Sequence, residues 1–103
     1  MKKNALITGA TGSIGMATVD ILSKKFNLIL VARNEKKLEE LSSKNNSVIK
    51  CVKCDLSNPD EIKFLIENIN NDNLDVDVLV NNAGINDDSL FFENEFRKMG
   101  KCY

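Results

Sequence analysis

The 103-residue chain contains no histidine and no tryptophan, and it has only one proline, one tyrosine and three cysteines. A zinc site needs about four ligands, and three cysteines without histidine are too few, so we expect no metal site. An excess of either charge is also lacking, because 14 basic and 15 acidic residues leave a net charge of −1. This balance gives no field that would attract nucleic acid or a membrane surface.

Long apolar runs are absent too. No stretch approaches the ~20 residues that span a bilayer, and the apolar segment after the first four residues is too short for a signal-peptide core. We therefore predict a cytoplasmic protein. The apolar fraction of 43% is sufficient for the core of one small domain, so residues 1–103 are predicted to form a single domain.

Two of the cysteines have the C-x-x-C spacing, which could indicate a redox pair or half of a zinc site. However, Cys51 and Cys54 lie in VIKCVKC, a stretch that reads as a strand. Residues three apart on a strand point to opposite faces, so the two thiols cannot converge. We interpret both cysteines as structural or incidental.

Strands and helices are predicted to alternate along the chain. Apolar runs predict strands at residues 5–7, 28–32, 48–54 and 76–80. Helices are expected at residues 14–25, after Asn34 as a cap, and after Asn58, where Pro59 and Glu61 complete a strong start signal. The expected inward faces are Ile14, Ala17, Ile21 and Leu22 in the first helix, Leu38 and Leu41 in the second, and Ile62, Leu65, Ile66 and Ile69 in the third.

This alternation predicts an α/β fold of three layers, with helices on both faces of a parallel sheet. In the Rossmann-type version, which binds nucleotides, the strand order is 3-2-1-4. The first and fourth strands then flank the point where the chain reverses its direction across the sheet. Two unusual loops follow these strands: TGATGSIG at residues 8–15 and NNAG at residues 81–84.

The glycine-rich loop joins a strand to a helix. Glycine lets a backbone turn sharply and approach a ligand closely, and the helix N-terminus beyond it suits a pyrophosphate. Gly15 is expected to permit close packing of the helix against the strand. The alternative is a tight turn without a ligand, which three glycines in seven positions make less favourable.

Together, TGATGSIG and NNAG resemble the short-chain dehydrogenase/reductase family over residues 5–92. The stretch DVLVNNAGINDDSL is especially similar to that of 3-oxoacyl-(acyl-carrier-protein) reductases. The resemblance implies an oxidoreductase that uses NAD(P) and acts on carbonyl or alcohol groups. One departure is Ser13, which stands where the compact branch of the family usually has glycine.

The resemblance also implies a set of cofactor-binding residues. The pyrophosphate would be surrounded by Gly9, Thr11, Gly12, Ser13, Ile14 and Gly15. Asp55, followed by Leu56, would accept a hydrogen bond from the adenine amino group. Asn82, Ala83 and Gly84 would line the cofactor near the adenosine ribose, with Asn82 also tying the fourth strand to its neighbours.

Cofactor preference is predicted from the end of the second strand. NAD-type sites usually carry an acidic residue there, whereas this chain has Arg33, and Glu35 is the nearest acid. A guanidinium can pair with a 2′-phosphate and stack on adenine, so NADP is preferred over NAD. The alternative is that Arg33 is an ordinary solvated side chain.

Catalysis in the resembled family depends on a Tyr-x-x-x-Lys motif, a serine and an asparagine. The only tyrosine here is Tyr103, and Ser89 does not match the family's serine, so no catalytic residue is named. We expect a partial, truncated form that is inactive alone. The alternatives are a nucleotide-binding module that needs a second chain and a structural remnant that binds nothing. Self-association is also expected through an uncovered fourth strand with the residues Val76, Val78, Leu79 and Val80.

Overall fold

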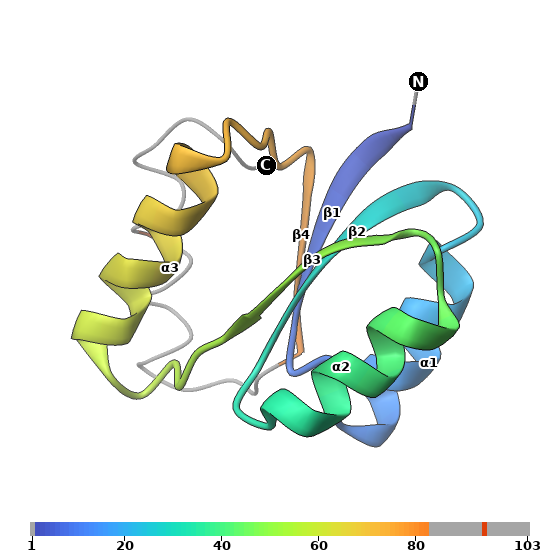
Figure 1. Cartoon of the computed structure of the whole chain (residues 1–103), viewed down its shortest axis with the longest axis horizontal. Helices are drawn as coiled ribbons and strands as arrows, with labels where there is room; N and C mark the ends of the chain where they lie inside the picture. Colours follow the sequence, from blue (N-terminus) through green and yellow to red (C-terminus); the bar gives the residue numbers. More distant parts are fainter. Residues whose placement is uncertain (1, 83–93, 95–103) are drawn as a thin grey trace.

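Residues 2–82 and residue 94 are described by a computed structural model of the chain. The elements alternate in the order β1 (Lys3–Thr8), α1 (Ser13–Leu22), β2 (Phe26–Ala32), α2 (Glu35–Lys44), β3 (Val48–Lys53), α3 (Pro59–Asn71) and β4 (Val78–Asn81). All neighbouring strands pair in parallel, in the order β3-β2-β1-β4 (Figure 1). The predicted fold class and strand order are therefore confirmed.

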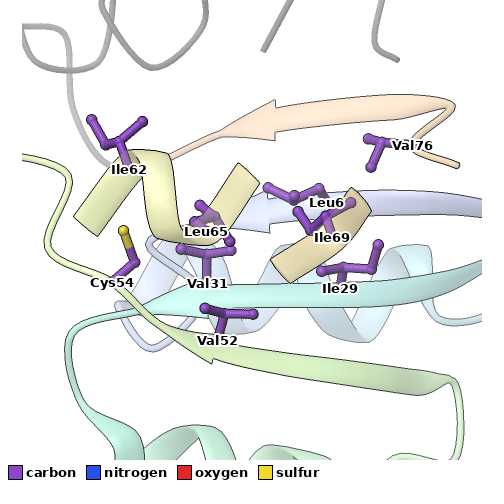
Figure 2. Packing of buried hydrophobic residues seen from close by; sticks show 9 residues of the cluster. All are labelled: Leu6, Ile29, Val31, Val52, Cys54, Ile62, Leu65, Ile69 and Val76. Carbon is purple, nitrogen blue, oxygen red and sulfur yellow. The ribbon is translucent and has the colours of Figure 1, made fainter. Parts of the chain in front are cut away.

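The sheet separates two apolar cores, because successive side chains of a strand point to opposite faces. Helices α1 and α2 cover one face and α3 covers the other (Figure 1). The core on the α3 side contains Leu6, Ile29, Val31, Val52, Cys54, Ile62, Leu65, Ile69 and Val76 (Figure 2). The core on the side of α1 and α2 contains Ala5, Ile7, Ala10, Val19, Leu28, Leu30, Ala32 and Leu38. Burying each large side chain contributes about 1.5–3 kcal/mol, so the two cores hold the helices on the sheet.

The signals for the second and third helices are confirmed. The side chain of Asn34 accepts a hydrogen bond from the backbone N–H of Lys37, and that of Asn58 accepts from Asp60. Both bonds satisfy amide groups that a helix start leaves without partners. The predicted apolar stripes face the sheet: Leu38, Ile62, Leu65 and Ile69 are buried, and Leu41 and Ile66 pack against the cores.

The two cysteines of the C-x-x-C sequence lie on opposite faces of the sheet, as predicted. Cys54 belongs to the core on the α3 side, and Cys51 packs against the other core. Burial raises the pKa of Cys54 to about 11 and also raises that of Cys51. Both thiols are therefore protonated at neutral pH, which agrees with the structural interpretation.

The predicted inner face of the first helix is wrong for three of its four residues, and only Leu22 is confirmed. Ile14 and Ile21 are 74% and 66% exposed, and Ala17 is exposed as well. Gly15 and Val19 face the sheet instead, with Leu22 partly buried beside them. The physical reason is the contact between Gly15 and the loop after β1, described below, because this contact sets the rotation of α1 about its axis.

The placement of Val76 on an uncovered fourth strand is also wrong. Val76 is 3% exposed, and it belongs to the core on the α3 side. It precedes β4, which begins at Val78, and hydrogen bonds between the segments of Asn4 and Asp77 hold this part of the chain to β1. Val78, Leu79 and Val80 are half-buried.

No helix in residues 2–82 is long and apolar enough to cross a bilayer.

Candidate functional site

The two unusual loops meet at the edge of the sheet that the carboxyl ends of its strands form. Strands β1 and β4 are paired neighbours, with Thr8 opposite Asn81, so the segments that follow them begin side by side. Thr8 is fully buried, and its Oγ1 donates to Asn81 Oδ1 (2.8 Å) and accepts from the Asn82 N–H (3.0 Å). This hydroxyl fixes the glycine-rich loop against the end of β4.

Within the glycine-rich loop, two glycines are required by the backbone itself. Gly9 has a φ of 62°, in the left-handed region that favours glycine. Gly15 lies against the same turn, where an added Cβ would be 2.0 Å from the Gly9 carbonyl oxygen and 2.9 Å from the Ala10 Cα. The first turn of α1 can therefore approach β1 only without a side chain at position 15.

Gly12 differs from these two glycines. A Cβ there would meet only the Gly9 carbonyl oxygen, at 3.6 Å, which is an ordinary contact. Its φ of −77° and ψ of 169° suit any residue. The fold thus leaves open space over Gly12 at the start of α1, which a ligand could approach closely.

The amino end of α1 also differs electrostatically from those of the other helices. Gly12 supplies no side-chain cap, and no acidic residue lies in the first turn of α1. In contrast, α2 and α3 have asparagine caps and acidic residues in their first turns. Unneutralised helix dipole and uncapped N–H groups favour an anion at the start of α1. Ser13 and Ile14 are exposed beside it, and Thr11 is half-buried.

Arg33 and Asp55 lie at the same edge of the sheet, after β2 and β3. Arg33 is exposed and Asp55 is half-buried, with Leu56 partly packed against the core on the α3 side. Hydrogen bonds from the Ser57 hydroxyl and backbone lower the pKa of Asp55, and the nearby positive charge of Arg33 lowers it further. Asp55 is consequently a carboxylate at neutral pH, ready to accept a hydrogen bond.

Asn82 lies between β1 and α1. Besides the bond from its N–H to Thr8, its side-chain amide donates to the Thr18 hydroxyl of α1 at 3.5 Å. The other two predicted residues of this loop, Ala83 and Gly84, lie outside the described residues, as do Ser89 and Tyr103.

Sequence reasoning assigned no role at this edge to Thr8, Thr18, Ser57 or Glu61, although Thr8 stands in the TGATGSIG motif and Glu61 in a predicted helix start. Thr8 precedes Gly9 and could have been noticed as a lone polar residue at the end of an apolar strand. Ser57 follows Asp55 at the spacing of an Asx turn, which is a local signal. The contact of Asn82 with Thr18 joins residues 64 positions apart and has no local signal.

Comparison with known proteins places the chain in a family. The family model described as short chain dehydrogenase matches residues 3–103. The 3-oxoacyl-(acyl-carrier-protein) reductase of Rickettsia typhi is 42% identical over 91 residues, which cover 85% of this chain and 35% of that protein. The chain spans only 35–39% of the length of five curated relatives that it matches.

Solved structures agree with this placement. The L-sorbose reductase of Gluconobacter frateurii, in complex with NADPH and L-sorbose, superposes with a TM-score of 0.72 at 31% identity, over 82% of this chain and 34% of that one. A variant of the actinorhodin polyketide ketoreductase with NADPH gives a TM-score of 0.70 at 25% identity, over 97% and 46% of the two chains. Sequence motifs, sheet order and loop geometry lead to the same conclusion: the chain belongs to the short chain dehydrogenase family.

Proposed function

We propose that residues 1–103 form the NADP(H)-binding part of an oxidoreductase that acts on carbonyl or alcohol groups. The observation that carries this proposal is the open, uncapped start of α1 at Gly12, in the loop that Thr8 joins to the end of β4. Gly9 and Gly15 serve the backbone, whereas Gly12 leaves space that the fold itself does not need. A pyrophosphate fits this position because its charge complements the helix N-terminus.

In this proposal each part of the edge binds a part of the dinucleotide. Gly9, Thr11, Gly12, Ser13, Ile14 and Gly15 surround the pyrophosphate; Asp55 and Leu56 contact the adenine; and Asn82, Ala83 and Gly84 line the side next to the adenosine ribose. Arg33 pairs with a 2′-phosphate. When bound, the nicotinamide accepts or supplies a hydride. Two solved relatives were determined with NADPH, which supports the choice of NADP over NAD.

For the whole protein, a 3-oxoacyl thioester is the substrate class that we propose, because the Rickettsia typhi relative is named as a 3-oxoacyl-(acyl-carrier-protein) reductase. A polypeptide of these 103 residues contains no Tyr-x-x-x-Lys sequence, so no side chain can exchange a proton with the substrate oxygen as that motif does. We therefore expect this polypeptide to bind cofactor without turnover. Oxidation of NADPH by the polypeptide with 3-oxoacyl substrates would contradict that expectation.

The preference for NADP is tested by changing Arg33. We expect Arg33→Ala to weaken NADPH binding by about 1–3 kcal/mol, the scale of a hydrogen bond to a charged group, and to leave NADH binding nearly unchanged. Isothermal titration calorimetry with both nucleotides measures the two effects. Lys25→Ala is the matched control, because it removes the same charge from an exposed position. Lys25 precedes β2, at the amino ends of the strands and away from the proposed site. Equal affinities of the unmodified chain for NADH and NADPH would refute the assignment.

A module that pairs with another chain is the second candidate. Strand β4 pairs with β1, and it is the end strand of the sheet within residues 2–82. Its sequence VLVN carries no charge. In contrast, β3, the end strand on the other side of the sheet, carries Lys50 and Lys53, which discourage strand addition. The uncharged edge favours pairing through β4.

Self-association of the 103-residue polypeptide is therefore expected to depend on β4. Sedimentation velocity should show a mass that rises with concentration, and Val80→Lys should reduce this rise by placing a charge on the edge. Ile49→Lys on β3 is the control and should have little effect, because Ile49 is already 45% exposed on an edge protected by lysines. Circular dichroism verifies that both variants are folded. A monomer at every concentration would contradict the prediction.

A further inference from the structure

Asp55 is held more firmly than its position after a strand requires. Its backbone N–H donates to Glu61 Oε1 at 3.1 Å, and its carbonyl oxygen accepts from the Asn58 N–H at 3.0 Å. Its side-chain Oδ1 accepts from the Ser57 N–H at 3.0 Å and from the Ser57 Oγ at 2.7 Å. Bonds at three different atoms fix both the backbone and the carboxylate plane.

The two bonds from Ser57 have a directional consequence. Both reach Oδ1, so within residues 2–82 the hydrogen bonds to this carboxylate leave Oδ2 to accept from a ligand. An acceptor that is already oriented loses less side-chain entropy when it binds a donor. The Ser57 hydroxyl therefore prepares Asp55 for one directed hydrogen bond.

The start of α3 does not account for Ser57. The helix has its own cap, because the Asn58 side chain accepts from the Asp60 N–H at 3.0 Å, and Pro59 occupies the first turn. Ser57 is exposed, so its side chain contributes nothing to either core. The contact of its hydroxyl with Oδ1 is the interaction that the structure assigns to this side chain.

We propose that Ser57 is a positioning residue through which Asp55 recognises the 6-amino group of adenine. This inference rests on the proposed function, because it needs a dinucleotide at this edge of the sheet. Ser57 does not touch the nucleotide: it holds Oδ1, and Oδ2 accepts from the amino group. The discrimination made here is between purine bases, and it is separate from the contact of Arg33 with the 2′-phosphate.

The test compares NADPH with its hypoxanthine counterpart, which has a carbonyl oxygen in place of the amino group and gives Asp55 no donor there. Calorimetric titration of the 103-residue chain should show tighter binding of NADPH. Ser57→Ala should weaken NADPH binding by about fivefold, the effect of one hydrogen bond, and weaken the hypoxanthine nucleotide by less than about twofold. Ser57→Thr, which keeps the hydroxyl, should restore the preference for adenine.

Ser43→Ala is the matched control, because it removes an exposed hydroxyl that donates to the Glu40 carbonyl oxygen on α2. It should change neither affinity. Equal weakening of both nucleotides by Ser57→Ala, or no weakening of NADPH, would overturn the role of Ser57 and leave the proposed function standing. Failure of the unmodified chain to bind NADPH would instead refute the proposed function, and the inference with it.

Discussion

Substitution of Gly15 by alanine should lower the midpoint of thermal unfolding by about 10 °C or more. The new Cβ would lie 2.0 Å from the Gly9 carbonyl oxygen, so the backbone of the loop or of α1 must move. Overpacking of this kind costs about 3 kcal/mol or more when no flexible side chain can give way. In a domain of this size, each kcal/mol corresponds to roughly 4–8 °C. Differential scanning calorimetry of both proteins measures the shift.

Gly12→Ala is the matched control for this experiment. Its Cβ would make only an ordinary contact, at 3.6 Å, and its backbone angles suit alanine. Alanine is a poorer helix cap than glycine by some tenths of a kcal/mol, so the midpoint should fall by about 2–5 °C at most. A loss of stability as large as that of Gly15→Ala would contradict the conclusion that a Cβ has space at Gly12 but not at Gly15.

Gly12→Asp should abolish binding of NADPH at concentrations that saturate the unmodified chain. The substitution places a carboxylate at the start of α1, where we propose the pyrophosphate binds. Contact between like charges costs several kcal/mol, so the affinity should fall by about 100-fold or more. An acidic residue at a helix start is compatible with the helix dipole, so the fold should remain stable. Calorimetric titration and circular dichroism measure the two properties separately.

Asn46→Asp controls for the change in net charge. Asn46 is exposed between α2 and β3, at the amino ends of the strands, whereas Gly12 lies at their carboxyl ends. The charge introduced at position 46 should therefore not affect NADPH binding. Retention of NADPH affinity by Gly12→Asp would contradict the placement of the pyrophosphate. Loss of affinity in both variants would indicate a general effect of charge instead of a local one.

Most of the architecture followed from short-range patterns. The starts of α2 and α3 were predictable because asparagine caps act within three residues of themselves. The stripe of Ile62, Leu65 and Ile69 was predictable because helical period alone places these side chains on one face. Parallel pairing followed from the alternation of strands and helices, since each crossover returns the chain in the same direction.

The candidate site was predictable in part. Both loops were located from their glycines and asparagines, and the strand order brought them together as expected. The roles of Arg33, Asp55 and Asn82 toward a nucleotide remain predictions. The buried hydroxyl of Thr8 was missed because its partners, Asn81 and Asn82, are more than 70 positions away along the chain.

The sequence by itself determined the elements, their order and the edge where the loops gather, because caps, periodicity and glycine-rich turns act over a few residues. Only the tertiary structure decided the rotation of α1, where Gly15 displaced Ile14 and Ile21 from the inner face. It also decided that the space for a Cβ is free at Gly12, whereas the Gly9 carbonyl group occupies that space at Gly15. These features depend on the distance between two backbones, and this distance is set by packing across the sheet and not by any local pattern of residues.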